Sequence, residues 1–183
     1  MRAWRVVGAV TAIAGVLAVV AVAAAAILAV PVSGGSMRPT LTEGDRVLLH
    51  PFGADVERGD VVAARFGPGE PLVVKRVIAL PGDAVRAVPG DRGPLVQVRH
   101  AGEADWRTVP TPPGDWAGDP EACCLPDGRA GDPALVDPDG AVVPGGSAFL
   151  LGDDPARSDD SRAFGWAPLA EVRGVVWLRV WPP

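Results

Sequence analysis

The stretch from Leu72 to Asp83, LVVKRVIALPGD, is an apolar run that ends in a Pro-Gly-Asp turn sequence. Its β-branched residues favour an extended strand, and the proline and glycine end that strand. Successive side chains of a strand point to opposite faces, so Lys75 shares an apolar face with Val73 and Val77. The stretch therefore predicts a strand over residues 72–80 that carries one lysine on its apolar side.

Further short apolar runs lie on both sides of this strand, separated by Gly, Pro and Asp. This pattern is typical of an antiparallel β domain, so the predicted fold class is mainly β. Residues 110–146 are rich in Pro, Gly and Asp with little periodicity, and are interpreted as an excursion rather than a second core. The other strands are expected at 46–50, 61–66, 85–88, 95–100, 106–109, 147–152 and 172–180.

The N-terminal part of the chain has a different character. Residues 6–32 contain no charge and are rich in Ala, Val, Leu and Ile, and about 20 such residues span a bilayer as a helix. Arg2 and Arg5 precede the run, which places that end in the cytoplasm. The sequence predicts a cytoplasmic N-terminus and single-pass anchor in residues 1–32, with an extracytoplasmic catalytic domain in residues 33–183. A cleaved signal peptide is the alternative, because small residues at 23–29 resemble a cleavage site.

Charge and lysine usage narrow the function. The net charge is −5 with acids and bases interspersed, and without a basic stripe nucleic acid is not an expected partner. Lys75 is the single lysine among 17 basic residues. Arginine stays protonated in proteins, whereas a buried lysine can lose its proton and act as a base. The alternative is that Lys75 is a chance survivor of a coding bias towards arginine.

Two other chemistries have weaker support. The adjacent Cys123 and Cys124 rarely satisfy ordinary disulfide geometry, so free thiols, a strained bridge and intermolecular links remain open. No metal is expected, because no further ligands have convincing spacing. His50 and His100 are the only histidines, and neither lies in a recognisable catalytic triad motif.

A candidate nucleophile follows the anchor directly, in the segment SGGSMRPTL at residues 33–41. Glycines before a serine allow a sharp backbone and close approach of a substrate. A nucleophilic Ser36 needs such exposure and a backbone N–H that faces a developing oxyanion. The segment taken alone also fits a Gly/Ser linker that leaves a membrane.

A third candidate segment is GDDPARSDDSR at residues 152–162. Its hydroxyls can orient an amine, and its carboxylate–guanidinium pairs can brace a loop. The alternating ligands and terminal Glu of an EF-hand calcium loop are missing. A solvated acidic loop is the alternative interpretation.

Together these segments resemble the signal peptidase I family. Residues 36–40 match the family's Ser-Met-x-Pro-Thr motif, and residues 44–48, GDRVL, resemble its next block. Residues 75–83 resemble the lysine block, and residues 152–165 resemble the last block, Gly-Asp-Asn-x-x-x-Ser-x-Asp-Ser-Arg followed by Gly. All four occur in the family's order behind an N-terminal anchor, which is far more specific than any one match.

The resemblance implies a membrane serine endopeptidase with a Ser–Lys dyad and no cofactor. Its partners would be the lipid bilayer and exported preproteins, from which it removes signal peptides. By position, Ser36 is the nucleophile and Lys75 the general base. Ser158 would orient the Lys75 amine, and a structural ion pair would hold that loop, formed by Asp160 and Arg162.

The oxyanion is assigned to the backbone N–H of Ser36. Some family members have a serine two residues before the nucleophile, where this chain has Gly34, so Ser33 is kept as a further candidate. Asp154 replaces the usual Asn of the last block. Two alternatives remain: a protease of the same clan that matures one dedicated substrate, and a catalytically inactive tethered β domain that binds a partner.

Overall fold

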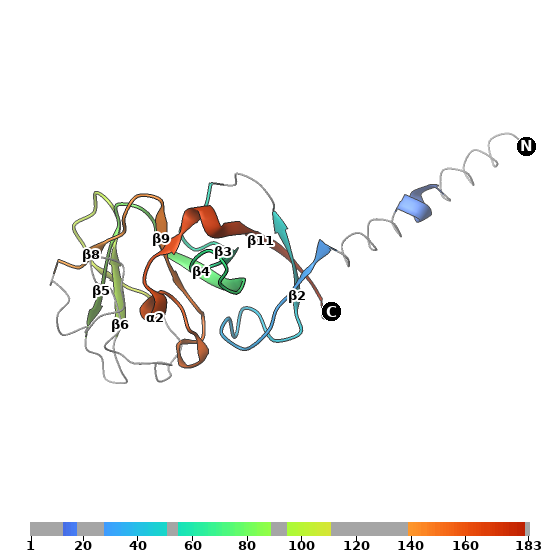
Figure 1. The fold of residues 1–183 in the computed structure, drawn as a ribbon, viewed down its shortest axis with the longest axis horizontal. Coiled ribbons are helices and arrows are strands. Elements are labelled where there is room, and N and C mark those ends of the chain that lie inside the picture. The colour runs from blue at the N-terminus through green and yellow to red at the C-terminus, as the bar shows by residue number, and fades with distance from the viewer. Residues whose placement is uncertain (1–12, 18–27, 51–54, 89–94, 111–138, 182–183) are drawn as a thin grey trace, which may run out of the picture.

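A computed structural model describes residues 13–17, 28–50, 55–88, 95–110 and 139–181 of the chain. Its strands form two antiparallel sheets (Figure 1), which confirms the prediction of a mainly β, antiparallel domain. The first sheet has the order β1 (Val30–Pro31), β2 (Arg46–His50), β11 (Val172–Trp181), β3 (Val61–Ala64), β4 (Val73–Ala79), β9 (Ser147–Leu151) and β10 (Ala167–Pro168). The second has the order β7 (Arg107–Thr108), β6 (Leu95–Arg99), β5 (Ala84–Val88) and β8 (Ala141–Val142).

Short helical turns interrupt the strands near the C-terminus. They are η2 (Pro155–Arg157), α2 (Ser161–Phe164) and η3 (Leu169–Glu171). All eight predicted strands are present, and none of their ends differs by more than two residues from the prediction. The Val61 strand, for example, ends at Ala64 because the next N–H, that of Arg65, donates to Glu171 instead of the sheet.

Three apolar clusters form the core of the described residues. One lies between β4, β9 and the second sheet, around Phe149 and Val85. Another lies on one face of the first sheet, where Val62, Val77 and Leu150 pack together. The third joins the segment after β1 to β2 and is considered with the site below. Alternation along β4 buries Lys75, Val77 and Ala79, as the period-2 pattern predicts.

The last residues of the predicted excursion at 110–146 add a short strand, β8, to the second sheet. β8 pairs with β5, and Ala141 and Val143 are buried in the cluster around Phe149. Two residues are too short a run for a periodicity signal, so the sequence did not predict this strand. Residues 111–138, including Cys123 and Cys124, lie outside the described residues.

The predicted anchor is described only in part. Residues 13–17 are helical, and their side chains Ile13, Val16 and Leu17 are exposed. Among the described residues, no helix has the length and apolar character needed to cross a membrane. The remainder of the apolar run up to residue 27 lies outside the described residues.

The Pro-Gly-Asp turn after β4 is held by a buried carboxylate. Asp83 accepts two hydrogen bonds from the Arg58 guanidinium, at 2.7 and 2.8 Å. It also accepts from the backbone N–H groups of Leu80 and Ala101. Burial by itself would raise the Asp83 pKa, but these hydrogen bonds together lower that pKa from 3.8 to about 2. The carboxylate therefore connects the segment before β3, the turn after β4 and the segment after β6.

We expect Asp83→Asn to destabilise the domain in a pH-dependent way. A carboxylate with a lowered pKa stabilises the fold above its unfolded pKa, and this contribution is lost as pH falls towards 2. One pKa unit corresponds to about 1.4 kcal/mol. The free energy of unfolding of the wild type should therefore exceed that of the variant by about 2 kcal/mol at pH 7. Urea unfolding of the two proteins between pH 7 and pH 2.5 measures this difference, with the exposed Asp55→Asn as control. A difference that stays constant over this range would contradict the assignment.

Candidate active site

The structure brings Ser36 and Lys75 together. The Lys75 Nζ atom lies 2.9 Å from the Ser36 Oγ atom, within hydrogen-bond distance. Ser36 belongs to the turns between β1 and β2, whereas Lys75 is the third residue of β4. Two groups 39 residues apart in the sequence thus form the pair of hydroxyl and amine that a Ser–Lys dyad requires.

Buried neighbours fix the position of Ser36. Met37 is 1 % exposed and packs with Val47 of β2 in a cluster against which Val74 of β4 also lies. Asp154 donates its backbone N–H to the Ser36 carbonyl at 2.9 Å. The backbone of Ser36 is therefore held by the packing of the neighbouring Met37 side chain and by a hydrogen bond from the loop after β9.

The peptide plane before Ser36 is also fixed. The Arg38 N–H donates to the Gly35 carbonyl at 3.1 Å. In a planar trans peptide the C=O and the following N–H point in opposite directions. The Ser36 N–H therefore points away from the Arg38 N–H, and its role in stabilising an oxyanion stays a prediction.

The environment of Lys75 favours its neutral form. Its side chain is 3 % exposed and lies on the face of β4 that carries Val77. Burial lowers the pKa of the amine, while the charges of Asp160 and Asp159 act in the opposite direction and that of Arg162 adds to the lowering. Together these effects lower the Lys75 pKa below its ordinary value of 10.5. A larger fraction of this amine is therefore neutral near pH 7 than for an exposed lysine.

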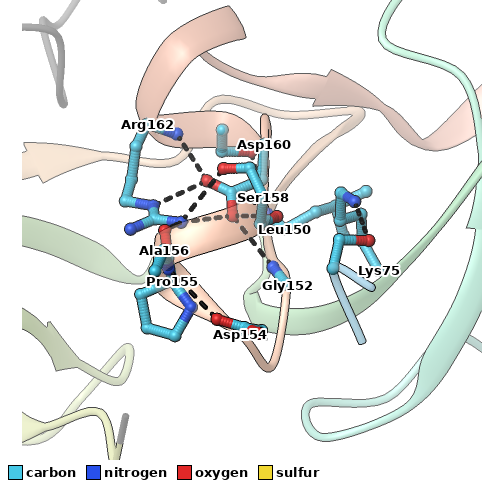
Figure 2. A network of polar contacts seen from close by, with 11 residues as sticks. Lys75, Leu150, Gly152, Asp154, Pro155, Ala156, Ser158, Asp160 and Arg162 are labelled. Atoms are coloured by element: carbon cyan, nitrogen blue, oxygen red, sulfur yellow. Dashed lines mark hydrogen bonds and ion pairs between the residues drawn. The ribbon is translucent and has the colours of Figure 1, made fainter. Parts of the chain in front are cut away.

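A buried polar network lies to one side of the dyad, as Figure 2 shows. The Asp160 carboxylate accepts from Arg162 Nε at 2.8 Å, from the Ser158 hydroxyl at 2.7 Å and from the Gly152 N–H at 2.9 Å. Arg162 also donates to the carbonyls of Ser158 and Pro155. Asp160 is 0 % and Arg162 is 5 % exposed, so this is a buried ion pair whose two members also hydrogen-bond to neighbouring groups.

Ser158 lies in this network rather than in direct contact with the lysine. Its hydroxyl donates to Asp160, which leaves its oxygen lone pairs able to accept from an amine. No hydrogen bond joins Ser158 to Lys75 in the described part of the chain, so its orienting role stays a prediction. Ser33 is exposed, and its side chain makes no hydrogen bond to the dyad among the described residues.

Gly152 separates the dyad from the network. A Cβ atom added there would lie 2.6 Å from the Ser36 carbonyl oxygen and would also overlap the Ser158 side chain. Its neighbour Asp153 accepts hydrogen bonds from the Nε and Nη2 atoms of Arg76, at 2.8 and 2.6 Å. Neither contact could be predicted from the Gly-Asp dipeptide in the sequence, because both contacts depend on how β4 and β9 pair.

We expect Gly152→Ala to lower the cleavage rate by about 100-fold or more while the domain stays folded. The added methyl group must displace Ser36 or Ser158, and displacements of about 1 Å at reacting groups cost such factors. Measured kcat for a preprotein and far-UV circular dichroism of the same sample test this, with Gly145→Ala as the control at an open position. Full activity of Gly152→Ala would show that the close packing has no role.

β4 has an open edge next to the dyad. Val73 to Arg76 pair with β3 on one side. On the other side β9 begins to pair only at Arg76, opposite Leu151. Among the described strands, none covers this side of Val73, Val74 and Lys75. An extended peptide can add to such an edge and pass the Ser36 hydroxyl.

Comparison with known proteins identifies the family. The protein-family model described as signal peptidase, peptidase S26, matches residues 4–181. The chain belongs to this signal peptidase family.

Curated signal peptidases cover most of the chain. It is 34 % identical to signal peptidase I of Bacillus caldolyticus, over 82 % of this chain and 78 % of that protein. It is 30 % identical to signal peptidase IB of Staphylococcus aureus, over 82 % of this chain and 76 % of that protein. A crystal structure of a signal peptidase I from Enterococcus faecalis is similar at a TM-score of 0.44 and 24 % identity, over 67 % of this chain and 97 % of that one. The family resemblance drawn from the sequence motifs is confirmed.

Proposed function

We propose that the chain is a membrane-anchored serine endopeptidase that removes signal peptides from exported preproteins with Ser36 and Lys75. The observation that carries this proposal is the 2.9 Å contact between the Ser36 hydroxyl and the buried Lys75 amine. Desolvation supplies what the chemistry needs, because a buried amine with a lowered pKa can take a proton from a hydroxyl.

The dyad would act in two half-reactions. Neutral Lys75 takes the proton of the Ser36 hydroxyl as Oγ attacks the scissile carbonyl, and the Ser36 N–H stabilises the oxyanion. Protonated Lys75 then gives its proton to the leaving amine, which leaves an acyl-enzyme. Neutral Lys75 next takes a proton from water as the water oxygen attacks the ester, and it returns that proton to the Ser36 Oγ atom as the signal peptide is released. Every proton therefore passes through one nitrogen.

The supporting residues would keep that nitrogen in place. Asp160 and Arg162 hold the loop in which Ser158 lies, and the Ser158 oxygen would accept a hydrogen bond from the lysine ammonium. The family resemblance implies small residues at positions −1 and −3 of the preprotein, and these residues would lie along the open edge of β4, where the partly buried Val74 adds an apolar side chain.

Anchoring would place this site at the outer surface of the membrane. Residues 13–17 are helical with exposed apolar side chains, and Ser36 follows the predicted anchor after only a few residues. A substrate that emerges from the bilayer would meet the dyad at the membrane–water boundary. Protease protection of the domain in sealed inverted vesicles, with its loss on detergent addition, tests this topology.

An acylating serine inhibitor tests the proposed nucleophile. Purified full-length protein should be labelled on Ser36, as located by mass spectrometry, and Ser36→Ala should not be labelled. Ser147→Ala is a matched control because its hydroxyl lies at the start of β9, away from Lys75. An unlabelled wild type would favour the inactive β domain. Labelling combined with cleavage of one propeptide but of no signal peptide in a panel would favour the dedicated maturation protease.

A further inference from the structure

The protein has a pocket of about 360 Å³ between its two sheets, next to the dyad. Three chain segments that carry the site also line it. Thr40 follows the Ser36 turn, Arg76 follows Lys75, and Asp153 follows Gly152 at the end of β9. The pocket is therefore built on the same framework as the dyad, but on the face of β4 opposite the Lys75 amine.

The lining combines an apolar interior with a polar rim. Ile78, Val109 and Leu151 give aliphatic walls. At the rim, Arg76 is bound by Asp153 and donates to the Thr40 hydroxyl at 3.3 Å. Because this arginine is already neutralised by a bidentate partner, the pocket offers no free charge to an ionic ligand. It suits an uncharged, apolar side chain.

The strand pairing shows which part of a substrate reaches this pocket. A peptide along the open edge of β4 can extend only beside Val73 to Lys75, because β9 occupies the edge from Arg76 onward. One half of the substrate lies along that edge. The other half must leave the edge at Gly152 and Asp153, which line the pocket.

We infer that this pocket binds an apolar side chain of the mature protein, within the first residues after the cleavage site. This inference rests on the proposed function, in which the signal-peptide half of the substrate occupies the β4 edge. The pocket then makes the enzyme sensitive to the sequence on the mature side of the cut. A protease built on the signal-peptide half alone would lack this preference.

The test uses full-length enzyme in detergent and one preprotein with Gly, Ala, Leu or Phe at positions +1 to +3. Val109→Trp fills the pocket, and Ile78→Ala enlarges it. Val142→Trp is the matched control, because Val142 is 57 % exposed on β8 and does not line the pocket. The readout is kcat/KM for each substrate, with a second series that varies only positions −1 and −3.

We expect wild type to prefer Leu or Phe over Gly at one of the positions +1 to +3 by about tenfold. Val109→Trp should abolish that preference by lowering kcat/KM for the Leu and Phe substrates to the value for the glycine substrate. Val142→Trp should leave kcat/KM for every substrate within about twofold of wild type. Ile78→Ala should shift the preference towards Phe. An unchanged preference in both pocket variants, an equal loss for all substrates, or a change confined to positions −1 and −3 would overturn the inference. Wild type that cuts no substrate would instead overturn the proposed function.

Discussion

Replacing Lys75 with methionine is expected to abolish preprotein cleavage, with a loss in kcat of about 10⁴-fold or more. Methionine fills nearly the same space beside Val77, so the strand and the position of Ser36 are retained. Only the proton acceptor 2.9 Å from the Ser36 hydroxyl is removed. Lys75→Arg should be equally inactive, because arginine keeps the charge but does not lose its proton in proteins.

The same substitution should increase stability. A buried amine with a lowered pKa destabilises the fold whenever it is protonated, and this cost grows as pH falls below the unfolded lysine pKa. We therefore expect Lys75→Met to melt at a higher temperature than wild type at pH 7, as removal of a functional buried charge often does. A lower melting temperature would mean that the inactivity reflects misfolding.

The pH dependence of the wild type tests the base independently. Activity should fall as pH decreases, because protonated Lys75 cannot accept the serine proton. Burial lowers its pKa, so the midpoint of this acid limb should lie well below the ordinary lysine value. A profile of kcat that is flat on its acid side would exclude Lys75 as the base.

Asp160→Asn is expected to cause the largest loss of stability in the domain, about 3–5 kcal/mol. The substitution leaves the buried Arg162 guanidinium without its counter-charge. It also alters the acceptor of the Gly152 N–H and the Ser158 hydroxyl. Glu171→Gln breaks the exposed pair with Arg173 and should cost about 0.5 kcal/mol or less. Urea unfolding followed by tryptophan fluorescence compares the two.

The double variant Asp160→Asn/Arg162→Met measures how much of the stability loss comes from leaving the Arg162 guanidinium unpaired. If the cost of the single change is mainly the stranded guanidinium, removing Arg162 as well should recover part of the lost stability. The Asp160 charge also raises the Lys75 pKa, so the acid limb of any residual activity should move to lower pH in Asp160→Asn. Equal costs for Asp160→Asn and Glu171→Gln would contradict the buried network.

Local patterns were enough to predict eight strands, but not the dyad. Burial alternates along β4 from Val74 to Ala79, in agreement with the period-2 pattern that places Lys75 and Val77 on one face. Ser36 and Lys75 were paired through the order of four motifs that resemble a known family, and the geometry agrees. The strand prediction depends on information within a few residues, whereas the pairing of the dyad depended on motifs spread along the chain.

The remaining features depend on contacts across the fold. β8 is too short for a pattern, and its pairing with β5 crosses more than 50 residues of sequence. Arg76 binds Asp153 and forms the rim of a pocket, and no pattern near Arg76 in the sequence predicts either contact. The close approach of Gly152 to Ser36 and Ser158 appears only once β4 and β9 are placed side by side.

The most direct test of the central claim is the cleavage of a purified preprotein by full-length enzyme in detergent, with the product located by mass spectrometry. Wild type, Ser36→Ala, Lys75→Arg and the control Ser147→Ala are compared on the same substrate. We expect wild type and Ser147→Ala to cut after the small residue at −1, and the other two variants to give no product. Cleavage at that position by Ser36→Ala or by Lys75→Arg would contradict the Ser–Lys mechanism.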